Sequence, residues 1–279
     1  PEDFGTRSQK PEHLELIDWL AVDFMEKGWS QKAIIKSILT SKTYQQSSLL
    51  TPELKERDPN NIFLARGPRF RAEAEVLRDI ALAASGLLTN KIGGPSVFPP
   101  VPDSVIKYNY VIPDYWYPAE DENRYRRSLY MFRKRSMPDP VLTSFDAPNA
   151  DESCTGRIRS NSPLSALTSL NEPIFVEASQ GLAQRILREG GQTNEDRANY
   201  GYLLTTSRPA SKSEAKEIAG LVESQNERLS DGWLDIRKIA FKDPDHIPEL
   251  PNDVTPREVA AWTIASRVLL NLDETLTKN

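Results

Sequence analysis

The sequence predicts a mainly α-helical protein, and three observations favour this fold class. Apolar residues recur at helical spacing in several segments, and Ser or Thr followed by Pro or by a capping box repeatedly marks a helix start. No two alternating apolar runs are joined by a hairpin turn. We therefore expect an irregular helical domain with a long, ordered loop region rich in proline and aromatic residues and an Arg-rich central connector.

The length of the chain and its first residue set the expected domain organisation. At 279 residues the chain can bury a substantial core as a single domain. Because it begins at Pro1 without a methionine, we interpret it as the C-terminal fragment of a longer protein. The pattern within 1–279 divides into a helical hairpin plus a third helix (1–90), a loop-rich connector (91–160) and a helical C-terminal part (161–279).

The composition argues against several classes of protein and site. The net charge of −5 argues against a nucleic-acid binder, and no apolar run approaches the roughly 20 residues of a membrane span. A single cysteine cannot form an internal disulfide or a multi-cysteine metal site. His13 and His246 lie far apart, so we predict no metal site. No C-x-x-C-H motif is present, and we expect no cofactor in this chain.

Three helices are predicted in the first 90 residues. The first spans 12–27 and stops at Gly28, and the second starts at Ser30, so the short turn between them indicates an antiparallel hairpin. The third spans 69–85 and stops at Gly86. The apolar stripes comprise Ile17, Leu20, Ala21 and Phe24 in the first helix, Ile34, Ile35, Ile38 and Leu39 in the second, and Phe70, Ala74, Leu77, Ala81 and Ala84 in the third.

The segment 91–123 does not have a helical pattern. Its prolines exclude a long helix, whereas its aromatic residues are too numerous for a disordered linker. We expect an ordered excursion on the protein surface. The aromatic residues are Tyr108, Tyr110, Tyr115, Trp116 and Tyr117.

Helical patterns return after residue 160. Ser162 and Pro163 predict a helix start with Leu164 and Leu167 facing inward, and a second helix is predicted over 173–189. Further helices are expected over 193–206, from the capping box at Ser211 and from the capping box at Thr255.

The candidate functional residues gather in the central stretch 124–176. An arginine-rich run there surrounds apolar residues, which is typical of a solvated face whose arginines point outward. Alternatively, some guanidinium groups pair with carboxylates, because their planar fork suits bidentate bonding. The expected partners are Glu75, Asp79, Asp139, Asp146, Asp151 and Glu152. The anion-binding candidates are Arg127, Arg133, Arg135, Arg157, Arg159 and Asn161.

Two further features of this stretch allow a structural or a chemical interpretation. In the tetrad Phe145-Asp146-Ala147-Pro148, Phe145 is expected to anchor a turn and Asp146 to accept backbone N–H bonds. The alternative role of Asp146 is that of a catalytic acid or base. Cys154 is expected to be a small buried residue, with activation by nearby arginines as the alternative.

The helix starts in this stretch suggest an anion site. Pro163 opens one helix, and Asn171 precedes the start of the next. A helix start offers unpaired N–H groups, and Arg157 and Arg159 lie just before it. The protein's own carboxylate is the alternative occupant.

These motifs resemble a known family. The chain is similar over nearly its whole length to the C-terminal domain of unknown function in large exported planctomycete proteins, many of which carry an N-terminal c-type cytochrome module. The family usually has glutamine where this chain has Ser165. The matching blocks are HLELIDWLA (13–21), KSILTSKTYQQSS (36–48), DPNN (58–61), RFRAEAEVLRD (69–79), GGPS (93–96), RRSLY (126–130), FDAP (145–148) with Cys154, Arg157, Arg159 and NSPL (161–164), LNEP (170–173) and LLNLDE (269–274).

The resemblance implies an exported, periplasmic or cell-surface protein whose missing N-terminal region carries the haem, but it implies no activity. Our first hypothesis is a binding or scaffold domain that docks against upstream domains. The second is an enzyme acting on an anionic carbohydrate through Asp146, Arg157 and Arg159. The third is an electron-transfer docking partner with a patch around Tyr115, Trp116 and Tyr117. The sequence alone does not decide whether the chain is an enzyme.

Overall fold

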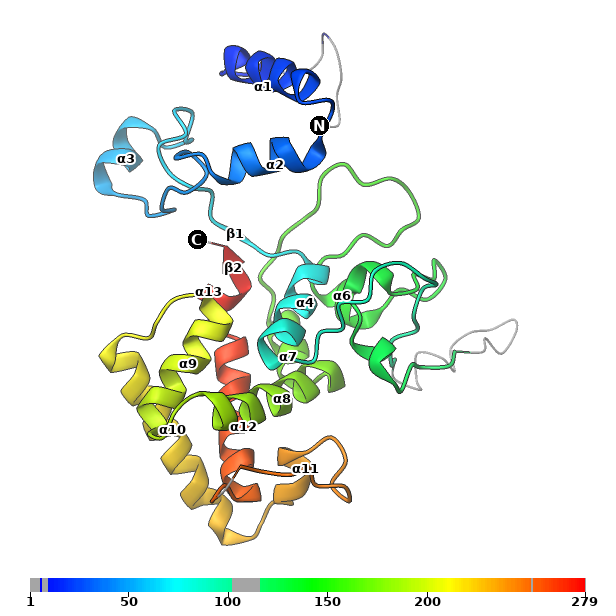
Figure 1. The fold of residues 1–279 in the computed structure, drawn as a ribbon, viewed down its shortest axis with the longest axis vertical. Helices are drawn as coiled ribbons and strands as arrows, with labels where there is room; N and C mark the ends of the chain where they lie inside the picture. Colours follow the sequence, from blue (N-terminus) through cyan, green and yellow to red (C-terminus); the bar gives the residue numbers. More distant parts are fainter. Residues whose placement is uncertain (1–5, 7–9, 102–115, 252, 279) are drawn as a thin grey trace. The chain divides into compact units, whose positions relative to one another are not determined.

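The structure is a computed structural model that describes residues 6, 10–101, 116–251 and 253–278, and helices dominate it (Figure 1). Within these ranges the sheet consists of β1 (Phe70–Arg71) and β2 (Thr277–Lys278), which are antiparallel with Phe70 opposite Lys278. Isolated β-bridges also join Thr89 to Arg126, Val97 to Met131 and Lys134 to Met137. The mainly α prediction is confirmed. The chain divides into two compact units, one reaching to Arg71 and including the last residues from Thr277, the other Ala72–Leu276.

The first unit contains the two helices predicted at its start and one further short helix. They are α1 (Leu14–Glu26), α2 (Gln31–Leu39) and α3 (Pro52–Arg57). Ser30 caps α2 as predicted, because its Oγ accepts a hydrogen bond from the N–H of Ala33 at 3.3 Å. The helices α1 and α2 contact each other, and neither contributes a buried side chain.

The third predicted helix starts later than expected. Helix α4 spans Ala74–Ser85, and Gly86 ends it with a positive φ of 77° as predicted. Its start at residue 69 was wrong, because Phe70 and Arg71 form β1 and the N–H of Ala72 donates to the carbonyl oxygen of Leu276 at 2.8 Å. The expected inward residues of α4 itself are buried: Ala74, Leu77, Ala81 and Ala84.

Four long helices form the centre of the second unit, and all four were predicted. Figure 1 shows α8 and α12 crossing, with α9 and α10 beside them. Both capping boxes are present, at Ser211 with Glu214 and at Thr255 with Glu258. These helices are α8 (Pro173–Glu189), α9 (Asn194–Thr206), α10 (Lys212–Arg228) and α12 (Pro256–Leu270).

Short elements join these helices. From here on, 'connector' means the Arg-rich run 124–135 within the predicted loop-rich stretch 91–160. It contains η3 (Ser128–Tyr130) and the end of η2 (Glu122–Tyr125) instead of a long helix or strand, so many of its backbone groups bond to other segments. The other short elements are α6 (Pro140–Ser144), α7 (Pro163–Asn171), η4 (Leu229–Asp231), α11 (Ile236–Ala240) and α13 (Asp273–Leu276).

The described part of the Pro- and aromatic-rich loop lies against the connector. Val97 donates its N–H to the carbonyl oxygen of Tyr130, and its own carbonyl oxygen accepts the N–H of Phe132, both at 2.8 Å. Trp116 is 8% exposed and donates its indole N–H to the carbonyl oxygen of Pro99 at 2.7 Å. The expected order is therefore seen in this part, whereas the predictions for Tyr108, Tyr110 and Tyr115 lie outside the described residues.

Helix α7 starts at Pro163 as predicted but presents the opposite face to the core. Leu164 and Leu167 are 62% and 57% exposed, so their predicted inward orientation was wrong. The buried face carries Ser165 and Ser169 instead. Their hydroxyl groups donate to the carbonyl oxygen of Ser144 at 2.8 Å and to the side-chain oxygen of Asn271. Satisfied hydrogen bonds make a serine face compatible with burial.

Replacing Leu182 by alanine should test where the core lies. Leu182 on α8 has no exposed area, so Leu182→Ala should leave a cavity and lower the free energy of unfolding by about 2–5 kcal/mol. The matched control Leu167→Ala should change it by less than about 0.5 kcal/mol, because that side chain already faces solvent. Denaturant unfolding of both variants measures the difference. Equal losses would contradict the observed orientation of α7.

Candidate functional site

Two adjacent residues of α4 fix the backbone of the connector. Arg78 is 2% exposed, and its guanidinium group donates to the carbonyl oxygens of Arg124 and Arg126, each at 2.8 Å. The carboxylate of Asp79 accepts the N–H of Ser128 at 2.7 Å. The irregular connector thus obtains from α4 the hydrogen-bond partners that it does not find within itself.

A second cluster joins the connector to α8. Arg124 forms a bidentate ion pair with Glu177, which is 8% exposed, and Tyr125 donates its hydroxyl to the same carboxylate at 2.8 Å. Burial and the charge of Glu177 raise the pKa of Tyr125, so the phenol remains a donor. The ammonium group of Lys242 lies 3.9 Å from Glu177. Sequence reasoning did not single out Glu177, because nothing in its helical stripe marks it as a partner of distant residues.

Arg126 holds the loop that precedes the connector. It is almost completely buried, and its guanidinium group donates to the carbonyl oxygens of Lys91 and Pro95, each at 3.1 Å, and of Gly93 at 2.5 Å. The same group lies 3.9 Å from the centre of the Tyr130 ring, within the range of a cation–π contact. Three carbonyl groups of the loop are therefore satisfied by one side chain.

The acidic start of α4 binds arginines from two segments. Glu75 pairs with Arg133 and, at 2.7 Å, with Arg157. Glu73 pairs with Arg157 at 3.0 Å and with Arg159 at 3.4 Å. Desolvation opposes ionisation of Glu75, but the hydrogen bond from Arg157 and the charge of Arg133 outweigh it and lower the pKa of Glu75.

Each of the five arginines proposed as anion-binding residues therefore has an acidic partner in the chain. Three of the carboxylates named as partners are used: Asp79 pairs with Arg127, Glu75 with Arg157, and Asp151 with Arg135 at 2.7 Å on the surface. Arg159 reaches Glu73, which was not among the expected partners. The predicted cationic cluster is thus divided among ion pairs instead of converging on one open site. These arginines are Arg127, Arg133, Arg135, Arg157 and Arg159.

Asp146 holds the segment that leads into α7. Its carboxylate accepts the backbone N–H of Ser160 at 2.7 Å and the Ser160 hydroxyl at 2.9 Å. Phe145 is buried against Phe175 with ring centres 5.9 Å apart, so it anchors the turn as expected. The protein's own carboxylate therefore lies beside the helix start that was predicted as an anion site. Asn161 is exposed there.

The expected burial of Cys154 was wrong. Its thiol is exposed and donates to the carbonyl oxygen of Gly156 at 3.2 Å. The loop around it lies on the surface, and the arginines that follow it reach back to the start of α4. At the end of α7, Asn171 donates to the carbonyl oxygen of Leu167 at 2.9 Å and accepts from Arg267 of α12 at 3.4 Å.

A small hollow gathers three charged residues that sequence reasoning did not connect. Arg78, Asp139 and Glu172 line it together with apolar residues, and it has room for about one water molecule. Burial raises the pKa of Asp139, and burial with the nearby charge of Asp139 raises that of Glu172. Both carboxylates precede a proline that opens a helix, a pattern visible in the sequence. A second hollow is lined by side chains between positions 132 and 150, among them Phe132, Arg133 and Ala150. Neither Asp146 nor Arg157 lines either hollow.

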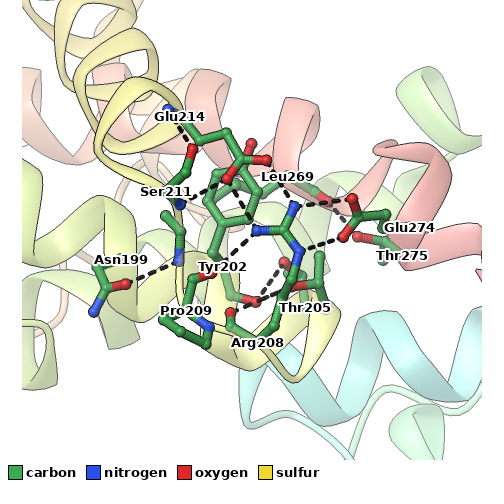
Figure 2. Close-up of polar contacts among 12 residues, drawn as sticks. Asn199, Tyr202, Thr205, Arg208, Pro209, Ser211, Glu214, Leu269, Glu274 and Thr275 are labelled. Atoms are coloured by element: carbon green, nitrogen blue, oxygen red, sulfur yellow. Dashed lines mark hydrogen bonds and ion pairs between the residues drawn. The ribbon is translucent and has the colours of Figure 1, made fainter. Parts of the chain in front are cut away.

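A further ion-pair network fixes the start of α10 (Figure 2). Arg208 forms bidentate contacts with Glu214 at 2.6 and 2.9 Å and with Glu274 at 2.6 and 2.9 Å. The hydrogen bond from Arg208, together with those from Ser211, lowers the pKa of Glu214 to about 2. The ring of Tyr202 lies 5.3 Å from the Arg208 guanidinium group. This network joins the end of α9 to α10 and α13.

The comparisons with known proteins assign a family and no activity. A family model described as a protein of unknown function (PSD1, DUF1553) matches residues 1–222. No curated protein and no solved structure matches the chain. In the part that the structure describes, no helix is long and apolar enough to cross a membrane, and no group of three acidic, histidine or cysteine residues is arranged to hold a metal ion.

Substituting Arg78 should show how far the connector depends on α4. Arg78→Lys keeps the charge but cannot reach both carbonyl oxygens, so it should lower the free energy of unfolding by about 1–3 kcal/mol. Arg127→Lys should have almost no effect, because the Arg127 side chain is largely exposed. Chemical denaturation of both variants provides the measurement. If Arg78→Lys left the free energy of unfolding unchanged, the connector would be shown not to need these two hydrogen bonds from α4.

The Arg208 network should make stability depend on pH. Because the pKa of Glu214 is lowered from 4.5 to about 2, its contribution is complete above about pH 4.5 and is lost as the pH falls towards 2. Glu214→Gln should therefore lower the melting temperature at neutral pH and weaken its dependence on pH below about 4.5. Thermal denaturation over a pH series checks both effects. Parallel curves for the variant and the wild type would rule out this contribution.

Proposed function

The chain belongs to the PSD1 family of proteins of unknown function, and we propose that it is a binding and scaffold domain of a longer, exported protein. The observation that carries this proposal is the internal pairing of the predicted anion-binding arginines. A guanidinium group that already binds a carboxylate must give up that partner before it can bind an external anion. The charges of these arginines therefore stabilise the fold instead of binding an external anion.

The position of these ion pairs supports a scaffold role. Arg133, Arg157 and Arg159 link the connector and the loop before α7 to the first turn of α4. Arg124 links the same connector to α8 in the core. Long irregular segments are thereby held against regular helices, which gives the domain a rigid surface. A rigid surface lowers the entropy lost when a partner binds.

The exposed face of α7 is the surface that we propose for docking. Leu164 and Leu167 lie on it, and Ile158 in the preceding loop is 77% exposed. Grouped exposed apolar side chains often mark interaction sites. The proposed partners are upstream domains of the same longer protein. From the family resemblance, these include a c-type cytochrome module that carries the haem, and the location is the periplasm or cell surface.

The two alternative functions have less support. An enzyme acting on an anionic polysaccharide would need Asp146, Arg157 and Arg159 around a substrate. Yet Asp146 binds Ser160, and both arginines bind acidic residues of α4. The electron-transfer alternative needs an exposed patch at Tyr115, Trp116 and Tyr117. Trp116 is buried, and Tyr115 lies outside the described residues. Tyr117 remains exposed.

The scaffold proposal predicts that the partly buried arginine pairs stabilise the fold. Arg157→Ala should lower the melting temperature by about 2–6 °C, because Glu73 and Glu75 lose a shared partner. Arg135→Ala should leave it unchanged, because this pair with Asp151 is largely exposed. Differential scanning calorimetry measures both.

An anion site at these arginines would give a different result. Arg157→Ala would then keep the wild-type melting temperature, and heparin, a sulfated polysaccharide, would raise the melting temperature of the wild type more than that of the variant. This outcome would contradict the scaffold proposal and favour the carbohydrate alternative.

A further inference from the structure

The first unit of the chain leaves its two longest helices uncovered. The buried hydrophobic residues of the described chain all lie from Ala72 onwards, so α1 and α2 contribute none. Their outward apolar side chains are each at least 40% exposed. A helix pair that hides so little apolar surface gains little from folding alone. The exposed residues that share one side of each helix, which we call the α1–α2 face, are Leu14, Trp19, Val22 and Met25 on α1, and Ile35, Ile38 and Leu39 on α2.

The two halves of this face carry opposite charges. Helix α1 has four acidic residues and no basic one: Glu15, Asp18, Asp23 and Glu26. Helix α2 has two lysines, Lys32 and Lys36, and no acidic residue. Asp23 pairs with Lys27, which follows α1. Within the described part of the chain, Glu15, Asp18, Lys32 and Lys36 make no ion pair, so their charges remain available to a partner.

This charge pattern selects a second copy of the same chain as the partner. We propose that two copies associate through the α1–α2 face, with α1 of each copy against α2 of the other. In a two-fold dimer every contact occurs twice with the roles exchanged. The acidic helix of each copy then meets the basic helix of its mate, while the apolar side chains are buried between them. The result is a four-helix contact of a kind that apolar helix faces commonly form.

The proposal goes beyond the scaffold role and does not depend on it, because the arginine pairs lie in the other unit. Failure of one leaves the other intact. Loss of the arginine pairs lowers the melting temperature, whereas self-association changes the molecular mass in solution. The two experiments therefore distinguish the two proposals.

Charge-reversal variants test the proposal with the full 279-residue chain. In Lys32→Glu/Lys36→Glu both helices become acidic, and in Glu15→Lys/Asp18→Lys both helices carry basic residues at the contact. Each variant alone should self-associate at least about tenfold more weakly than the wild type, because like charges meet at both contacts. Mixing equal amounts should restore the dimer, since the acidic variant complements the basic one. Sedimentation velocity over a concentration series gives the masses.

A matched control changes the same charges elsewhere. Lys212 and Lys216 are exposed and four residues apart on α10, as Lys32 and Lys36 are on α2. Lys212→Glu/Lys216→Glu should therefore dimerise like the wild type. Circular dichroism should show equal helix content in all variants, so that loss of association is not loss of folding.

Two results would overturn the proposal. In one, the wild type stays monomeric at every concentration, which means that another protein or another part of this chain covers the face. In the other, the wild type dimerises but the mixture of the two charge-reversed variants stays monomeric. The dimer would then use a different surface.

Discussion

The structure of the second unit depends on the buried guanidinium group of Arg78. The connector is too irregular for its backbone groups to bond to one another. The carbonyl oxygens of Arg124 and Arg126 accept hydrogen bonds from Arg78 on α4 instead. Only when this backbone is fixed can the Arg124 side chain reach Glu177, and the Arg126 side chain reach the carbonyl oxygens of the preceding loop. Arg78 thus binds the backbone of the same two arginines whose side chains join the connector to α8 and to the preceding loop.

The magnitudes of these contacts separate structural charges from surface charges. An exposed ion pair such as Arg135–Asp151 contributes roughly 0–1 kcal/mol, because water and salt screen it. Removing one partner of a buried pair such as Arg124–Glu177 costs about 3–5 kcal/mol, because it leaves the other charge buried and unpaired. The sequence shows both kinds of arginine in one run, and only burial distinguishes them. An arginine-rich segment therefore does not by itself indicate an anion site.

Local signals predicted the helices, and long-range partners caused the errors. Capping boxes at Ser211 and Thr255 correctly placed α10 and α12, because a cap involves residues three apart in sequence. Phe70 was misplaced in a helix because its strand partner lies more than two hundred residues away. The apolar spacing predicted the wrong buried face for α7. Ser165 and Ser169 are buried instead, because acceptors in other segments bind their hydroxyl groups. The pairing of Arg159 with Glu73 was missed for the same reason, because the two residues lie 86 positions apart in the sequence.

The two units differ in what their apolar residues do. In the second unit the apolar stripes of α8 and α12 meet each other, and residues such as Leu182 and Trp262 lose all contact with water. The stripes of α1 and α2 have the same helical period, but the described residues of the first unit do not bury them. Periodicity shows which residues of a helix share a face, whereas the charges beside that face limit what can cover it. An acidic helix next to a basic one disfavours a partner of uniform charge and favours a partner with the same two-part pattern in reverse, which a two-fold axis supplies from the chain itself.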